Sequence, residues 1–269
     1  MKQKQPTIRD ALYEAPGPKA RKRIAVATVF SILAIAALVI AVIRRFAENG
    51  QLDARYWSIF TRYTTWRFLG YGLVGTMTAA LTAGIITFFA GLLLMMGRIS
   101  SFKVLRALCT VLIEFSRGVP TLLFIYFFLL VVPQFGIRLP ALWKVAAPVA
   151  ISACGVVAEV LRSGVNAVPK GQTEAALSLG MRRSSVFFKI IFPQALRFVV
   201  PALISELVIV LKDTTFAYIV SYSDLMQNAR VLISNYDALL SVYLVTAIIY
   251  ILINYILNKI SVAAARRTR

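Results

Sequence analysis

The sequence predicts an all-α, polytopic membrane protein with about six transmembrane helices. Hydrophobic residues make up 59% of the 269-residue chain, and the mean hydropathy is +0.76. Six apolar runs are each about 20 residues long or slightly longer, which is the length that a helix needs to cross a bilayer. These runs are 24–43, 73–96, 108–132, 141–161, 199–220 and 239–257.

The apolar runs divide the chain into a tail, one extra helix and a larger helical part. Residues 1–23 are polar, and their basic end precedes an apolar run, as in a signal peptide. That run is about 20 residues long and no A-x-A cleavage site follows it, so we expect an uncleaved transmembrane helix at 24–45. Residues 46–69 then form an extracytoplasmic or interfacial segment, 70–260 hold five further helices, and 261–269 form a basic tail.

Aromatic and basic side chains alternate in the segment 47–71. Such interleaving occurs in proteins that bind single-stranded nucleic acid. Next to transmembrane helices it more often marks an interfacial belt, in which amphipathic rings lie among lipid headgroups. We therefore interpret this segment as a belt.

The Lys and Arg residues of the loops predict an orientation. With the N-terminus inside, the inner segments hold twenty basic residues and the outer segments about eight, so both termini are predicted to be cytoplasmic. This distribution also accounts for most of the net charge of +19, and no nucleic-acid partner is needed to explain it. The inner segments are 1–23, 97–107, 162–198 and 259–269.

The composition excludes several classes of enzyme and of metal site. The chain has no His, and its two Cys residues, Cys109 and Cys154, lie far apart in apolar surroundings. A Cys/His metal cluster, a disulfide framework and a nucleophile with a His base are therefore excluded. The sequence also contains no Walker A loop, no GxGxxG after a strand and no GxSxG elbow. We expect no catalytic residue, no metal and no cofactor in this chain.

Ionisable side chains within the apolar runs are candidates for a transport path, because a charge inside a bilayer is costly. Glu114 and Arg117 lie three positions apart on one predicted helix, and Glu159 and Arg162 do so on the next. Each pair can interact across one helical turn. Structural pairing near a membrane surface explains these residues as well as a role in transport does.

A third pair of acidic residues lies in the fifth apolar run. Glu206 and Asp213 are seven positions apart, which is about two helical turns, so they face the same side of the helix. One face of this helix is therefore expected to line a wet space.

A polar, basic loop of some thirty residues, 158–193, interrupts the apolar chain. Loops of this length inside a compact domain are usually functional or disordered. The loop contains a run of helix-forming residues, 174–179, followed by Gly180 at a plausible C′ position. We expect a short docking helix on the cytoplasmic face, within a cytoplasmic loop at about 162–198.

This loop resembles the EAA motif of ABC importer permease subunits. The match consists of an acidic residue and two alanines, a glycine four positions on, and a hydrophobic end that has Phe192 where Leu is usual. The residues that carry it are Glu174, Ala175, Ala176, Gly180, Ile190, Ile191 and Pro193.

Flanking stretches resemble the polar amino-acid branch of that family, the permeases of the histidine, glutamine and glutamate type. The similarity extends from about residue 70 to 257, and the departures are Val119, Val156 and Ser205, where Thr, an aromatic residue and Asn are usual. These departures do not change the family resemblance, but they do not identify the substrate. The flanking stretches are 117–120, 158–162, 170–172, 193–197 and 211–214.

The resemblance implies a subunit of a larger transporter. In such importers the EAA loop docks in a groove of a cytoplasmic ATPase dimer, which hydrolyses ATP and rocks the helices between inward-open and outward-open states. The resemblance also implies a second permease subunit, identical or homologous, an extracytoplasmic amino-acid-binding protein, and a location in the bacterial plasma (inner) membrane. The residues expected to couple to the ATPase are Gly171, Glu174, Ala175, Ala176 and Gly180.

The expected function is therefore uptake of a polar amino acid, with glutamate or a relative as the candidate. Carboxylates suit the ammonium group of such a substrate and a guanidinium suits its carboxylate. The candidate pathway residues are Glu114, Arg117, Glu159 and Glu206. An ion-coupled secondary transporter of small polar solutes, with Glu206 and Asp213 carrying protons, is the alternative.

Overall fold

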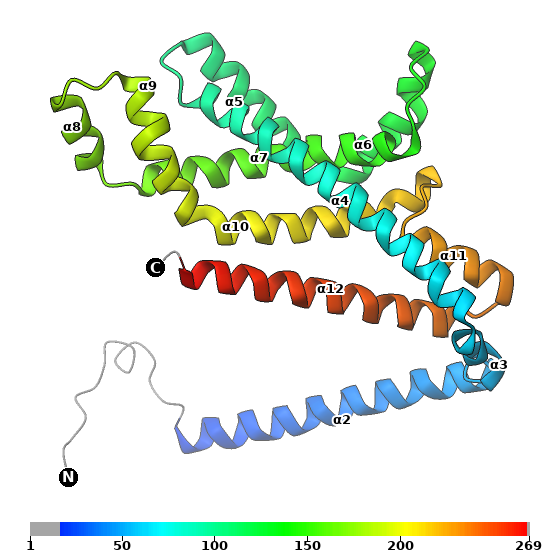
Figure 1. Ribbon diagram of the computed structural model, residues 1–269. Coiled ribbons are helices and arrows are strands. Elements are labelled where there is room, and N and C mark those ends of the chain that lie inside the picture. The colour runs from blue at the N-terminus through cyan, green and yellow to red at the C-terminus, as the bar shows by residue number, and fades with distance from the viewer. Residues whose placement is uncertain (1–16, 268–269) are drawn as a thin grey trace. The chain divides into compact units, whose positions relative to one another are not determined.

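The structure, a computed structural model, describes residues 17–267, and every regular element in this range is a helix (Figure 1). The chain divides into two compact units, Met1–Ala54 and Arg55–Arg269. Among the described residues, five helices are long and apolar enough to span a membrane, and a sixth span results if one bent pair is counted. This agrees with the predicted all-α fold of about six spans.

The first unit contains one long helix, α2 (Pro18–Glu48). Pro18 suits the start of a helix, where its missing N–H would have no partner in any case. None of the residues of α2 is buried within the chain, and its most apolar window has a mean hydropathy of 2.9. A surface of this kind is suited to lipid or to another apolar partner, as expected for the predicted span at 24–45.

The second unit begins with the short helices α3 (Ala54–Trp57) and η1 (Ser58–Thr61), followed by α4 (Tyr63–Arg98). The buried side of α4 is rich in Gly, Ala and Thr, which let helices approach closely. A Cβ atom added at Gly91 would lie only 2.8 Å from Val157 of the helix α7 (Ala141–Ala167). Gly91 therefore allows the two helices to pack closely.

The predicted span 108–132 consists of two helical stretches that meet at a sharp bend. The structure has α5 (Lys103–Gly118) and a second helical stretch, Thr121–Phe135, bent by 97° relative to α5. Val119 between them is extended, because a residue that precedes a proline is disfavoured in the helical region. The second stretch comprises α6 (Thr121–Tyr126), the π-helix η2 (Phe127–Val131) and the 3₁₀ turn η3 (Val132–Phe135).

The centre of the second unit is α7 (Ala141–Ala167), which packs against α4, α5 and α10. More than half of its most apolar window is buried inside the chain. After α7 come the elements of the polar loop and the next span, which are α8 (Lys170–Ser178), α9 (Arg183–Val186), the π-helix η4 (Phe187–Ile191), α10 (Phe192–Asp213) and the 3₁₀ helix η5 (Thr214–Val220).

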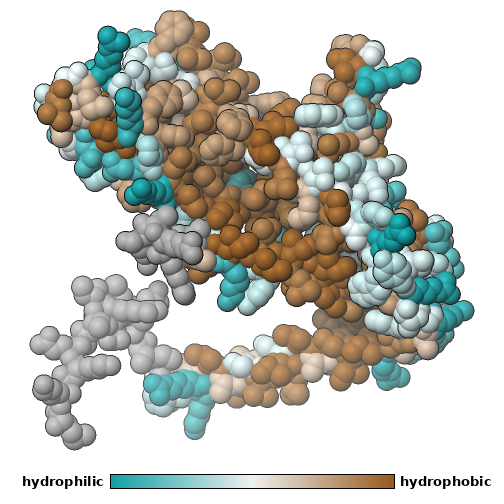
Figure 2. All heavy atoms as spheres, in the orientation of Figure 1, coloured by the Kyte–Doolittle hydropathy of each residue, from teal (hydrophilic) through white to brown (hydrophobic). Residues whose placement is uncertain are grey.

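The chain ends with α11 (Leu225–Tyr236) and α12 (Leu239–Arg267). Asp224 caps α11, since its side chain accepts a hydrogen bond from the backbone N–H of Gln227. Leucine and alanine side chains of α11 form a core with α4 and α12. In Figure 2, hydrophilic side chains gather around α8 and around α11, while apolar side chains cover the helices between them.

Candidate functional site

The polar loop folds as the sequence predicts, with a short helix that ends at a glycine. Gly180 has a φ of 75° and follows the C-cap residue Leu179 of α8. Its N–H donates to the carbonyl of Leu177 (2.9 Å), and the N–H of Met181 donates to the carbonyl of Ala176 (3.2 Å). This pair of bonds is a Schellman motif, which satisfies the free carbonyls at a helix end.

The predicted coupling residues divide between two surfaces of α8. Ala176 is 3% exposed and packs among the apolar side chains of the same loop and of α10, which are Val168, Val186, Ile191 and Ala195. Gly171, Glu174, Ala175 and Gly180 are all exposed. The small size of Ala176 thus serves packing inside this chain, and the other four residues form an accessible face.

The accessible face of α8 also carries an apolar residue that sequence reasoning missed. Leu179 is 83% exposed, which is the largest exposed fraction among the large hydrophobic residues of the described part of the chain. Its position, one residue before Gly180 at the end of the helix, is the signal that could have identified it. Leu177 of the same helix is also exposed, so two leucines add apolar surface to this segment, and exposed apolar patches mark contacts with other proteins.

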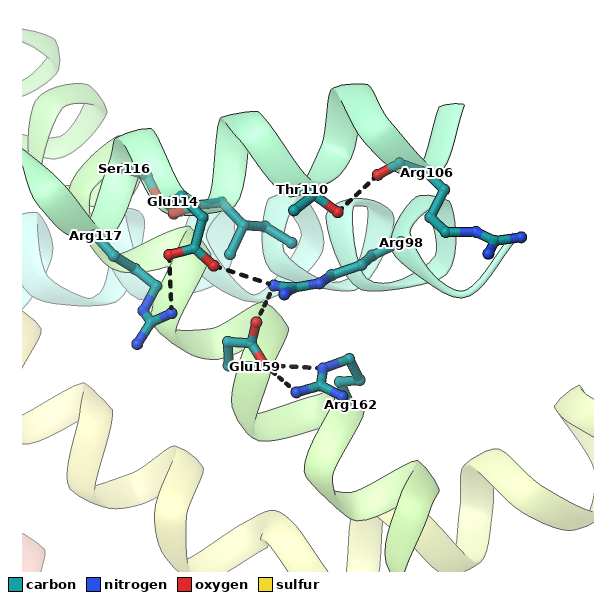
Figure 3. Close-up of polar contacts among 9 residues, drawn as sticks. Arg98, Arg106, Thr110, Glu114, Ser116, Arg117, Glu159 and Arg162 are labelled. Carbon is teal, nitrogen blue, oxygen red and sulfur yellow. Dashed lines mark hydrogen bonds and ion pairs between the residues drawn. The ribbon is translucent and has the colours of Figure 1, made fainter. Parts of the chain in front are cut away.

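A second candidate site is a network of ion pairs that joins α4, α5 and α7 (Figure 3). Glu159 of α7 accepts hydrogen bonds from Arg162, at 2.8 Å, and from Arg98 at the end of α4. Arg98 also lies 3.6 Å from Glu114 of α5, which pairs with Arg117 at 3.5 Å. Three of the four predicted pathway residues therefore lie in one connected cluster.

Arg98 was not among the predicted site residues. It was assigned to a loop as a topology signal, yet it holds the two predicted pairs together. Three guanidinium groups face two carboxylates, so the network carries one uncompensated positive charge. Such a cluster can attract an anionic group, because arginine pairs well with carboxylates.

Glu206, the fourth predicted pathway residue, lies apart from the network. It is 8% exposed and lines a largely apolar groove of about 410 Å³ formed by α4, α7 and α10. Within residues 17–267 its side chain has no ion pair or hydrogen bond. A buried, unpaired carboxylate is costly, and this is typical of a functional residue.

Asp213, which was predicted to share a face with Glu206, binds the bent span. Its carboxylate accepts a hydrogen bond of 2.8 Å from Thr121, whose hydroxyl also lies 2.9 Å from that of Ser152. These three side chains connect α10, the start of α6 and α7. Asp213 therefore has a structural role at the bend.

The described residues include no cluster of three or more His, Cys, Asp or Glu side chains that could hold a metal ion. Cys109 and Cys154 are both buried and unpaired with each other.

Comparison with known proteins identifies the family. Residues 88–269 match the family described as "Binding-protein-dependent transport system inner membrane component". The chain is 35% identical over 226 residues to the glutamate transport system permease protein GluD of Corynebacterium glutamicum, and covers 82% of each sequence. It is 34% identical over 203 residues to the probable glutamine ABC transporter permease protein GlnP of Bacillus subtilis, with 74% of this chain and 91% of the relative covered.

Solved structures show the same fold. A chain of the crystal structure of an amino acid ABC transporter with histidines matches with a TM-score of 0.72 and 30% identity, over 79% of this chain and 98% of the other. A chain of the MetNI methionine ABC transporter in an inward-facing conformation matches with a TM-score of 0.66 over 77% of this chain. Its identity is 17%, so this second match supports the fold alone. With more than half of its length matched, the chain belongs to the family of binding-protein-dependent transport system inner membrane components, the multi-pass permease subunits of ABC importers.

Proposed function

We propose that this permease subunit carries a polar amino acid of the glutamate or glutamine kind. The observation that carries this proposal is the 35% identity with a glutamate permease over 82% of both chains. The positive excess of the ion-pair network supports it, because the network offers a guanidinium to a substrate carboxylate. Family membership decides against the ion-coupled secondary transporter that the sequence left open.

The proposed assembly pairs this chain with a second permease subunit, identical or homologous. Two ATP-binding subunits lie below the pair, and an extracytoplasmic amino-acid-binding protein delivers the substrate. The predicted orientation, with both termini and the polar loop in the cytoplasm, places α8 on the side of the ATPase. The N-terminal helix α2 is an addition to the core in this proposal, since it belongs to a compact unit of its own.

In this proposal α8 couples the chain to the ATPase through its exposed residues. Gly171 and Ala175 allow close approach of a partner, Glu174 meets basic groups, and Leu179 enters an apolar depression. Ala176 holds α8 against η4 and α10, so that a displacement of α8 is transmitted to the span. The pathway candidates remain Glu114, Arg117, Glu159 and Glu206.

The test is transport by the assembled complex in proteoliposomes. The chain is purified together with its ATPase and partner permease, ATP is enclosed, and the binding protein is added outside. Uptake of labelled L-glutamate or L-glutamine that requires both ATP and the binding protein is the expected result. Uptake of neither compound, with ATP-dependent uptake of an apolar amino acid or a sugar, would contradict the proposal.

The orientation is tested separately with single cysteine residues. A cysteine in place of Ser178 on α8 is expected to react with an impermeant maleimide only after the cells are opened. A cysteine in place of Arg138, in the turn after Gly136, is expected to react in intact spheroplasts. The opposite pattern would reverse the proposed topology.

A further inference from the structure

A second groove lies between α10 and α12, on a side of α10 that faces away from the groove of Glu206. Its volume is about 420 Å³, and two of the residues that line it, Val208 and Ile209, are apolar. The polar residues that line it are Ser205, Lys212, Asn254, Tyr255, Asn258 and Ser261. So many polar groups along two membrane-spanning helices are unexpected for a surface that faces lipid.

The groove has one charged residue, Lys212, and no carboxylate lines it. The ammonium group of Lys212 has no ion pair within residues 17–267, although the side chain belongs to a spanning helix. The side-chain oxygen Oδ1 of Asn254 is buried and accepts no hydrogen bond within the described residues. Ser205 and Ser261 donate to the carbonyl of Pro201, at 3.0 and 3.1 Å, so these two hydroxyl groups are already engaged. The ammonium group of Lys212 and the side-chain N–H and O–H groups of Asn254, Asn258 and Tyr255 are the donors that the groove offers to a ligand.

The groove extends from Ser261, near the end of the span Leu239–Ala263, to Asn254 well inside it. Asn254 is fifteen residues from the start of the span Leu239–Ala263 and nine from its end, which corresponds to about 22 Å and about 14 Å along the helix. A lipid phosphate lies at the membrane surface, outside a hydrocarbon core of about 30 Å. This depth favours a solute that enters from a pathway over a headgroup.

We propose that the groove between α10 and α12 binds the carboxylate of the transported solute. The ammonium of Lys212 supplies the counter-charge, and the amides of Asn254 and Asn258 and the hydroxyl of Tyr255 donate hydrogen bonds. The proposal rests on the proposed function, because the solute must be a carboxylate. It adds a subsite that is distinct from the ion-pair network and from the groove of Glu206.

Cysteine chemistry tests the anion preference directly. Asn258 is exposed, and a cysteine there stands at the edge of the groove, whereas both native cysteines are buried. In the assembled complex, the rates of reaction of Asn258→Cys with an anionic methanethiosulfonate and with its cationic analogue are each divided by the rate of that reagent with a free thiol in solution. We expect the normalised rate to be at least fivefold higher for the anionic reagent. Adding Lys212→Gln should abolish that preference, whereas adding Lys259→Gln should leave it.

Lys259 is a matched control, because it lies on the same helix next to Asn258 but does not line the groove, and its ammonium lies over the ring of Tyr255 at 5.3 Å. An equal loss of preference in Lys212→Gln and Lys259→Gln would overturn the proposal. If 10 mM L-glutamate in neutral detergent slows the reaction of the cysteine with the methanethiosulfonate, the anion that the groove binds is the solute. Protection only by vesicles of anionic lipid would identify a headgroup and overturn it.

Transport separates this proposal from the proposed function. If the wild-type complex takes up L-glutamate or L-glutamine, Lys212→Gln should raise the half-saturating concentration of the solute at the inner site at least fivefold, while Lys259→Gln should not. Unchanged transport in Lys212→Gln would overturn the subsite and leave the importer function standing. Absence of amino-acid uptake by the wild-type complex would instead contradict the function itself.

Discussion

The guanidinium group of Arg98, the last residue of α4, contacts the carboxylate of Glu159 in α7, 61 positions later in the chain. Glu159 at the same time accepts from Arg162, one turn further along α7. Because α4 and α7 form the most extensive helix pair of the second unit, one carboxylate ties its two main helices together at one end.

We predict that Glu159→Gln destabilises the protein by about 1–3 kcal/mol, between the values for exposed and buried ion pairs. The change leaves Arg162 unpaired and leaves Arg98 with only Glu114, at 3.6 Å. The melting temperature of the protein in detergent should fall by about 2–12 °C, at roughly 2–4 °C per kcal/mol. Glu48→Gln is the control, since it breaks an exposed pair with Arg45 and should shift melting by less than about 1–2 °C. Equal shifts in the two variants would contradict the role of Glu159.

Local spacing was sufficient to predict half of this network. Glu114 with Arg117 and Glu159 with Arg162 are neighbours on one helix, and the structure confirms both pairs. Arg98 joins them only because α4 and α7 pack side by side, and no short-range pattern encodes that approach. Long-range contacts of this kind require the fold itself.

The polar loop shows the same division between local and tertiary information. Gly180 and the helix before it follow from residue propensities, and the structure confirms them. The burial of Ala176 depends on how α8 lies against η4 and α10, which the sequence does not reveal. Pro120 is a local signal for the break after Gly118, but the angle of 97° between the two helical stretches depends on packing that the sequence does not reveal.

Gly180→Ala should weaken coupling to the ATPase. Gly180 has a left-handed backbone, and a Cβ atom in that conformation costs about 1–2 kcal/mol, so the end of α8 should unwind in a large fraction of molecules. We expect uptake to fall several-fold while the amount of membrane-inserted protein stays the same. Gly70→Ala is the control, because Gly70 lies within the helix α4, outside the docking face of α8, and a Cβ there meets no other atom within 4 Å. Full uptake by Gly180→Ala would show that the Schellman turn is dispensable.

Two neighbouring alanines should respond differently to the same enlargement. Ala176→Leu places a large side chain in a closed apolar cluster and should cost about 1–3 kcal/mol, seen as lower melting of the isolated subunit. Ala175→Leu should leave melting unchanged, since Ala175 is exposed, but should weaken copurification of the ATPase. Reversal of these two outcomes would mean that Ala176, and not Ala175, lies in the docking surface.

The stability of the protein should depend on pH through Asp224, which lies outside the candidate spans. Burial raises the pKa of Asp224 to about 6, against the effect of the hydrogen bond from the backbone N–H of Gln227. Its pKa in the unfolded chain is about 3.9, so between about pH 4 and pH 6 the folded state binds the proton and the unfolded state does not. The contribution of Asp224 to stability is therefore most favourable below about pH 4, declines up to about pH 6, and is constant above that.

Asp224→Asn should remove this dependence, because asparagine caps α11 equally well and does not titrate. At pH 7 the variant should be more stable than the wild type by up to about 3 kcal/mol, the equivalent of about two pKa units, and the difference should narrow as the pH falls towards 4.5. Thermal unfolding in detergent between pH 4.5 and pH 7.5 measures both. Asp237→Asn removes an exposed carboxylate at the other end of α11 and should follow the wild type. If the Asp224→Asn curve runs parallel to that of the wild type over this range, Asp224 is ionised throughout and its burial does not govern its proton.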